Sequence, residues 1–390
     1  MGCQWGMLVA LAKLGSPEMV GQFAIGLAMS APVMMFANLQ LRAVQATDAR
    51  DEFAFGHYFG LRVATTLMAL AAIGALAWTG YAGQTAWVIF FTGVARAADA
   101  VSDVIYGLMQ RHEHMRTIAV SMMAKGVLAL PAFALGIARS GSVAWGVACM
   151  IGAWTFVLLA YDLPMAMRMN AGSPWSDWDR GIFLKLARLS LPLGAVMMLL
   201  SLNPNIPRYF LAHYQGEREL GIYAALAYIP VAGTAVINAL GQTMTSRLAQ
   251  YYARFEKRAF VRLVARAAGI GAALGTAMIA VAAVAGDHVI SMVYRSQYSG
   301  NKGMLVVLTV SGGIGFVASF LGFGATAARH FRMQLPLLGC VALTILLVSA
   351  LLVPGLGGMG AAWAVLAGSI VHLTLSFGLI AYAVRGLKRA

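Results

Sequence analysis

Arg96, Asp99 and Asp103 place three ionisable groups within eight positions of the segment TGVARAADAVSDVIYGLMQR, residues 92–111. At 100° per residue on a helix, they share one face with Thr92, Tyr106 and Gln110. Two chemistries stay open for this polar stripe. In the first, Arg96 pairs with one of the two carboxylates and locks the helix against its neighbours. In the second, one carboxylate takes up a proton or Na⁺, because a single arginine cannot neutralise two adjacent carboxylates.

The composition identifies the surroundings of these groups as a lipid bilayer. The 390-residue chain is 60% apolar and 11% charged, and its mean hydropathy is +0.76. Such a chain is excluded as a water-soluble enzyme, and its repeated apolar runs predict an all-α polytopic membrane protein. The net charge of +14 is spread between these runs, which argues against a nucleic-acid partner. The sequence has no P-loop motif and no paired-cysteine spacing, so we expect no cofactor and no metal.

Twelve apolar runs predict about twelve transmembrane helices. Their approximate bounds are 1–14, 23–41, 60–79, 84–110, 117–138, 141–161, 183–212, 221–244, 260–284, 303–328, 333–353 and 358–384. With a cytoplasmic amino terminus, twenty of the 28 Lys and Arg residues lie on the cytoplasmic side, Arg62 and Arg262 among them as anchors, and six lie on the other side. The remaining two, Arg96 and Lys125, lie inside spans. Both termini are therefore expected in the cytoplasm.

An internal repeat divides the chain into two halves of six spans. A shift of 200 residues places VGQFA (20–24) on LGIYA (220–224), and a shift of 218 places RHEHM (111–115) on RHFRM (329–333). Because six is even, both halves enter the membrane from the same side and form parallel repeats. The expected parts are an amino-terminal six-helix lobe with an incomplete first helix (1–162), a cytoplasmic interfacial linker (163–182) and a carboxy-terminal six-helix lobe (183–390).

The repeat also confines the polar stripe to the first lobe. A shift of 218 places Val317 and Leu321 at the positions of Asp99 and Asp103. A charge at the bilayer centre costs about 2.5–3.5 kcal/mol on insertion scales, so the stripe must face protein or a wet cavity. Any ion coupling is then expected in the first lobe alone.

Two segments carry a resemblance to a known family, GSPEMVGQFAIGLAMSAPVMMFANLQLRAVQATDA (15–49) and GERELGIYAALAYIPVAG (216–233). With the six-plus-six arrangement, they resemble the polysaccharide transport branch of the multidrug/oligosaccharidyl-lipid/polysaccharide exporter superfamily, over essentially the whole chain. The resemblance implies two six-helix lobes around a central cavity. It implies a flippase that moves undecaprenyl-diphosphate-linked oligosaccharides across the bacterial inner membrane by alternating access. The implied partners are this lipid-linked oligosaccharide, membrane lipids and polysaccharide polymerase machinery, with the flippase itself a monomer.

A lipid diphosphate requires cations, and arginine binds phosphate oxygens in bidentate fashion. Arg42 follows the second span in NLQLR, and Arg208 closes NPNIPR, where two prolines interrupt the seventh span and free backbone groups. Asn203 and Asn205 add polar groups beside Arg208. The alternatives are a cytoplasmic anchor for Arg42 and a snorkelling outer-end residue for Arg208.

Asn38 and Asn238 are paired by the shift of 200 and are candidates for hydrogen bonds to sugar hydroxyls. Hydrogen bonds between helices explain them equally well.

Two other functions stay open. A cation-coupled multidrug exporter of the same superfamily is favoured if aromatic and acidic residues dominate the cavity, whereas a ring of arginines favours the anionic lipid. A membrane enzyme acting on lipid-linked sugars would be expected to carry catalytic carboxylates in a large outer loop. The outer loops are instead short, and their acidic residues are Glu18, Glu217, Glu219 and Asp287.

Overall fold

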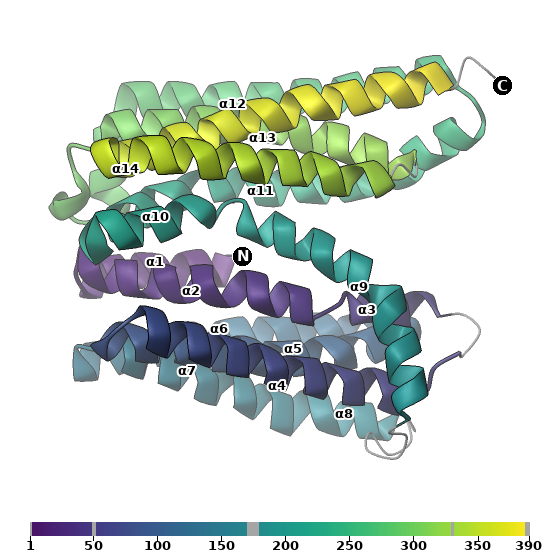
Figure 1. Ribbon diagram of the computed structural model, residues 1–390, viewed down its shortest axis with the longest axis horizontal. Coiled ribbons are helices and arrows are strands. Elements are labelled where there is room, and N and C mark those ends of the chain that lie inside the picture. Colours follow the sequence, from purple (N-terminus) through teal and green to yellow (C-terminus); the bar gives the residue numbers. More distant parts are fainter. Residues whose placement is uncertain (1, 49–51, 170–178, 329–330, 387–390) are drawn as a thin grey trace. The chain divides into compact units, whose positions relative to one another are not determined.

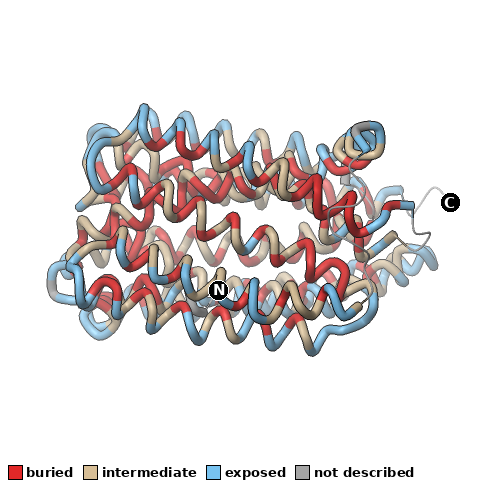
Figure 2. The backbone as a smooth tube through the Cα atoms, turned by 90° about the horizontal axis from the view of Figure 1, so that it is seen from below, coloured by how far each residue is buried: buried red, intermediate tan, exposed pale blue. Residues whose placement is uncertain are grey.

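The computed structural model describes residues 2–48, 52–169, 179–328 and 331–386, and within these ranges it consists of helices and their connections (Figure 1). The all-α fold class that the sequence predicts is therefore confirmed. Buried and exposed positions alternate along the helices, as Figure 2 shows. Such alternation is typical of helices that pack on protein with one face and meet the surroundings with the other.

Nine helices in the described ranges are long and apolar enough to cross a bilayer. One of them, α14 (Phe331–Gly386), covers two expected spans, because its backbone breaks at Gly357 with φ 53° and ψ −131°. α5 (Gly83–Arg111) has 29 residues, but its polar stripe lowers its hydropathy. α1 (Gly2–Leu14) has 13 residues, fewer than a full span requires. With α5, α1 and the second half of α14, the described helices account for the twelve expected runs, and the chain is a multi-pass membrane protein.

Residues Gly6–Leu202 form one compact unit. After α1 its elements are α2 (Pro17–Ala37), α3 (Leu41–Thr47), α4 (Phe55–Gly80), α5, α6 (Met115–Ser140), α7 (Val143–Val157), the π-helical turn η1 (Leu158–Asp162), α8 (Leu163–Arg168) and α9 (Arg180–Leu202). α5 is the central helix, since it packs against α2, α3, α4 and α7. α9, which the sequence places in the second lobe, packs against α2 within this unit.

Residues Asn203–Ala390 form the other compact unit together with Met1–Trp5. Its elements are α10 (Ile206–Tyr214), α11 (Gly216–Ala253), α12 (Lys257–Val293), the short 3₁₀ turn η2 (Ser296–Tyr298), α13 (Lys302–Ala327) and α14. α13 packs against α11, α12 and α14. It is thus the central helix of its unit, as α5 is of the other. The repeat shift of 218 residues places α5 on α13.

Candidate functional site

A cavity of about 420 Å³ lies beside α5 in the Gly6–Leu202 unit, and we call it the α5 cavity. The polar stripe faces it. The side chains that line it include those of Asn38, Arg42, Arg96, Asp99, Asp103, Tyr106 and Gln110. Thr92, the remaining member of the stripe, is buried, and its hydroxyl donates to the Val88 carbonyl at 2.6 Å. The structure therefore brings the predicted ion-coupling residues together with two of the predicted substrate-binding residues, Asn38 and Arg42.

The turn between α2 and α3 brings Arg42 to this cavity. Leu39 and Gln40 have φ values of 48° and 52°, in the left-handed region that residues other than glycine rarely occupy. Gly107 of α5 lets α3 approach closely, because a Cβ at this position would meet the Gln45 side chain and lie 3.2 Å from the Arg42 Cα. The left-handed turn directs α3 towards α5, and the lack of a side chain at Gly107 lets the two helices pack closely.

Arg42 contacts three members of the stripe. Its Nε donates to Gln110 Oε1 at 3.0 Å, and its Nη1 lies 3.5 Å from Asp103 Oδ1. Its guanidinium carbon lies 5.5 Å from the centroid of the Tyr106 ring, a cation–π distance. The side chain is 30% exposed, and a guanidinium carries five N–H donors, so donors remain for an anion in the cavity.

Arg62 is the residue whose predicted role is wrong. The sequence places it among the cytoplasmic anchors, but its side chain has no exposed surface. Its Nη2 lies 3.0 Å from Asp103 Oδ2, and its Nη1 donates to Asn38 Oδ1. Asp103 is therefore paired with two arginines from other helices, and Asn38 links α2 to α4.

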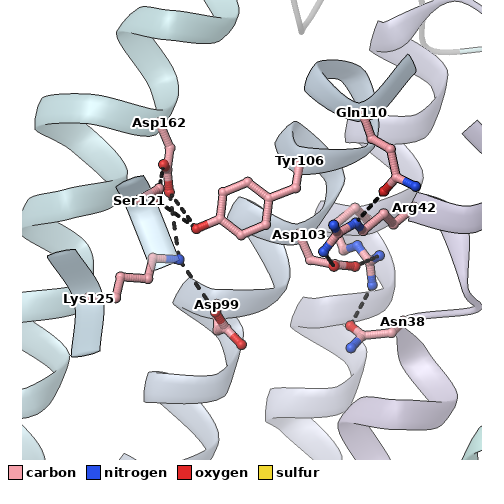
Figure 3. Close-up of polar contacts among 10 residues, drawn as sticks. Asn38, Arg42, Asp99, Asp103, Tyr106, Gln110, Ser121, Lys125 and Asp162 are labelled. Carbon is pink, nitrogen blue, oxygen red and sulfur yellow. Dashed lines mark hydrogen bonds and ion pairs between the residues drawn. The ribbon is translucent and has the colours of Figure 1, made fainter. Parts of the chain in front are cut away.

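Asp99 belongs to a second group of charges, shown in Figure 3. Lys125 Nζ of α6 lies 3.4 Å from Asp99 Oδ1 and 3.6 Å from Asp162 Oδ2. The hydroxyl of Ser121 donates to Asp162 Oδ1 at 2.5 Å and lies 2.6 Å from the hydroxyl of Tyr106. A continuous chain of polar contacts thus runs from the cavity to the buried Asp162.

The π-helical turn η1 places Asp162 at the end of this chain. Pro164 follows in the first turn of α8, and proline cannot donate the backbone hydrogen bond that a regular α-helix requires. π turns within helices occur frequently at functional sites. Sequence reasoning singled out neither Lys125 nor Asp162 as a site residue. The available signal was Lys125 itself, a cation inside an expected span, which requires a carboxylate partner from a neighbouring helix.

Arg208 lines a smaller cavity, of about 280 Å³, within the other unit. Its Nη1 donates to Asn205 Oδ1 at 3.0 Å, and its guanidinium lies 5.7 Å from the centroid of the Tyr228 ring. This cavity also has Ser311, Ser369 and His372 in its lining, and the two serine hydroxyls are 2.8 Å apart. Arginine and hydroxyl groups together are suited to phosphate or sugar oxygens.

The other predicted asparagines lie apart from these cavities. Asn203 is buried, and its side-chain amide donates to the Leu338 carbonyl at 3.4 Å. Asn238 is half-buried on α11 and is in the lining of neither cavity.

Val317 and Leu321, the repeat equivalents of Asp99 and Asp103, line an apolar groove of about 620 Å³ between α12, α13 and α14. The charged stripe has no counterpart at these positions. Among the described residues, no three His, Cys, Asp or Glu side chains gather in a way that could hold a metal ion.

Comparison with solved structures decides the fold. A multidrug resistance transporter of the MATE family, solved in an inward-facing conformation, superposes with a TM-score of 0.75 over 100% of this chain and 95% of its own, at 16% identity. The chain has the fold of the MOP superfamily. A MOP superfamily transporter from Pyrococcus furiosus, which has a binding pocket of reverse polarity, gives a TM-score of 0.65 at 16% identity, over 100% of this chain and 92% of its own. A Vibrio cholerae MATE transporter, VcmN, gives 0.63 at 14% identity, over 99% and 96%.

A relative with a polysaccharide-related name matches nearly the whole length of the chain. It is the capsular polysaccharide biosynthesis protein CapF of Staphylococcus aureus, which is 24% identical over 377 residues, 95% of this chain and 93% of its own. No family model matches the chain. The resemblance to the polysaccharide branch of the MOP superfamily, which the sequence indicates, is confirmed by this relative and by the shared fold.

Proposed function

We propose that this protein is a flippase that moves an undecaprenyl-diphosphate-linked oligosaccharide across the bacterial inner membrane for surface polysaccharide biosynthesis. The observation that carries the proposal is the partly exposed side chain of Arg42 in the α5 cavity, beside the side-chain amides of Asn38 and Gln110. Arginine suits the diphosphate, and amide groups suit the hydroxyls of the attached sugar. The name of the polysaccharide-related relative adds support.

The contacts of Arg42 allow its guanidinium to exchange the Asp103 carboxylate for a phosphate group. Its distance to Asp103 is 3.5 Å, longer than a normal charge-assisted hydrogen bond, while Arg62 holds the same carboxylate at 3.0 Å. A phosphate oxygen can therefore bind Arg42 in place of Asp103, and Asp103 stays paired with Arg62. Arg208 offers a second guanidinium in its own cavity, with hydroxyl groups beside it.

The transport cycle follows alternating access, in which the binding site opens first to one side of the membrane and then to the other. One carboxylate of the polar stripe, Asp99 or Asp103, exchanges a proton or Na⁺ with the cavity during the cycle. The protein acts as a monomer with both termini in the cytoplasm, as the distribution of Lys and Arg supports. Its partners are membrane lipids and, next to it in the membrane, polysaccharide polymerase machinery.

Glycan export by cells that lack the endogenous protein tests this function. Arg42→Ala and Arg208→Ala should each reduce surface polysaccharide at least tenfold at equal protein abundance. Arg→Lys at either position should be nearly as damaging, because an ammonium cannot reproduce the bidentate fork. Arg262→Ala, which removes an exposed cation from α12, is the matched control and should leave export unchanged. Full export by both alanine variants would exclude diphosphate binding by these arginines.

A multidrug exporter is the second candidate, and the methionines of the α5 cavity favour it. Met34, Met35, Met122 and Met197 contribute to the lining. Flexible thioether side chains adapt to ligands of different shape, as promiscuous binding sites require. Efflux of a cationic dye from cells that express the protein, with no gain in surface polysaccharide, would select this function over the flippase.

A further inference from the structure

Lys125 lies between two carboxylates of different exposure. Its ammonium is 3.4 Å from Asp99 Oδ1, and the Asp99 side chain is 53% exposed and lines the cavity. On the other side, Asp162 Oδ2 is 3.6 Å away, and the Asp162 side chain has no exposed surface. In the described ranges, Lys125 is the cation that the structure shows in contact with Asp162. A buried carboxylate without a cation is strongly unfavourable, so the ammonium must stay at this place.

The surroundings of this ammonium supply carboxylate oxygens of the kind that a free cation would also bind. Carboxylate oxygens come from two helical segments, and the Tyr106 ring centroid lies 5.2 Å from Nζ. Ser121 and the Tyr106 hydroxyl complete the polar contacts around Asp162. Hard cations take oxygen ligands of this kind, and a lysine ammonium carries the same single charge on a covalent tether.

Asp103 is in a different situation from Asp99. Its partners are Arg42 and the fully buried Arg62, and arginine keeps its charge at any physiological pH. A proton on Asp103 would remove the charge of the carboxylate that contacts the fully buried Arg62, and breaking a buried ion pair is strongly unfavourable. A proton on Asp99, by contrast, leaves Lys125 paired with Asp162.

We propose that Lys125 is a tethered cation that occupies the place a free Na⁺ would take between Asp99 and Asp162, so that this site exchanges a proton at Asp99 and does not bind Na⁺. The proton comes from cavity water, forms an O–H bond on the Asp99 carboxylate and returns to water when the acid ionises. Lys125 keeps its own proton throughout. The titratable and charged groups around Asp99 are Lys125 of α6, Asp162 of η1, Arg62 of α4, Arg42 of α3, and Arg96, Asp103 and Tyr106 of α5.

This inference rests on the proposed transport function for its purpose, but its test requires no substrate. The first measurement is the unfolding temperature of the purified protein in NaCl and in choline chloride of equal ionic strength. The wild-type protein should unfold at the same temperature in both salts. Lys125→Ala opens the place between the two carboxylates, so Na⁺ should raise its unfolding temperature by several degrees. Lys125→Arg keeps a tethered cation and should not respond to Na⁺.

The second measurement follows the proton by infrared spectroscopy. The carboxylic acid C=O band of the wild-type protein should grow as the pH falls. Asp99→Asn should remove the component of this band that comes from the Asp99 carboxyl group. Glu52→Gln, which alters a surface carboxylate 3.6 Å from Lys185, is the control and should retain that component.

Na⁺-specific stabilisation of the wild-type protein, or an unchanged infrared band in Asp99→Asn, would overturn the inference. If Lys125→Ala does not fold, the wild-type salt comparison and the infrared titration still decide. If both measurements give the expected results but the protein transports no glycan, the role of Lys125 as a tethered cation is supported and the flippase function is rejected.

Discussion

Arg62 and Asp103 form an ion pair in which Nη2 lies 3.0 Å from Oδ2 and the arginine side chain has no exposed surface. The pair joins α4 to the central helix α5 in the interior of the Gly6–Leu202 unit. Because Asp103 keeps 30% of its side chain exposed, the pair also connects this interior to the α5 cavity. Stability and cavity chemistry therefore depend on the same carboxylate.

Asp103→Asn should destabilise the protein far more than Asp99→Asn. Removal of one partner of a buried ion pair typically costs about 3–5 kcal/mol, and Asp103→Asn removes the carboxylate that contacts the buried Arg62. Asp99→Asn leaves Lys125 paired with Asp162, 3.6 Å away. Unfolding temperature in detergent and the yield of folded protein measure the difference. Equal losses in the two variants would show that the burial of Arg62 does not set the cost.

Gly107→Ala should displace the Arg42 side chain from its place in the α5 cavity without changing its charge. The added methyl group would meet the Gln45 side chain and lie 3.2 Å from the Arg42 Cα, so α3 must move away from α5. We expect a loss of about 1–3 kcal/mol from overpacking, together with reduced export. Gly152→Ala in α7 is the matched control, because a Cβ there meets nothing within 4 Å, and alanine favours a helix over glycine. A Gly107→Ala protein with wild-type stability and export would contradict the close packing of α3.

The helices could be predicted from the sequence because their signals are local. Length and hydropathy identify each span, and the two prolines in NPNIPR mark the break between α9 and α10. The inward orientation of the polar stripe also follows from a local argument, since lipid cannot solvate Asp99 or Asp103. These predictions required no knowledge of how one helix packs on another.

The partners of the stripe could not be predicted, because they depend on the rotation and depth of other helices. Arg62 stands near the start of α4, where a cytoplasmic anchor has the same sequence signal as a buried ion pair. Asp162 ends the π-helical turn η1 before Pro164, and its contact with Ser121 depends on how this turn and α6 are oriented. Hydropathy patterns do not reveal such a local change from α-helical to π-helical geometry.

Asp48 should contribute to stability in a pH-dependent manner. It lies outside the spanning helices, and burial raises the pKa of its carboxyl group, but hydrogen bonds from the Glu52 and Phe53 amides and from the Tyr58 hydroxyl lower it to a net value below 3.8. A group whose pKa is depressed in the folded state stabilises that state above its unfolded pKa, and the contribution is lost as the pH falls through the folded value. The wild-type protein should thus lose stability below about pH 4.

Asp48→Asn tests this contribution. The amide keeps one acceptor oxygen, so the variant should be about 1 kcal/mol less stable at neutral pH, and the difference from the wild type should shrink in acid. Unfolding temperature measured from pH 3 to pH 7 gives the comparison. Glu52→Gln serves as the control, because it alters a nearby surface carboxylate and keeps the backbone amide that Asp48 binds. A constant difference across this range would rule out the linkage to Asp48.

The two ends of α11 should lie on opposite sides of the membrane. Glu217 lies in the first turn of this 38-residue helix and Glu256 follows its end, and the cations around Glu256 predict the cytoplasmic side there. In a variant with Cys3, Cys149 and Cys340 replaced, Glu217→Cys should react with a membrane-impermeant thiol reagent in intact cells. Glu256→Cys should react only after the membrane is opened, and this labelling is its control for accessibility, since Glu256 is exposed in the structure. Labelling of Glu256→Cys in sealed cells would reverse the orientation, and labelling of both positions would mean that α11 does not cross the bilayer.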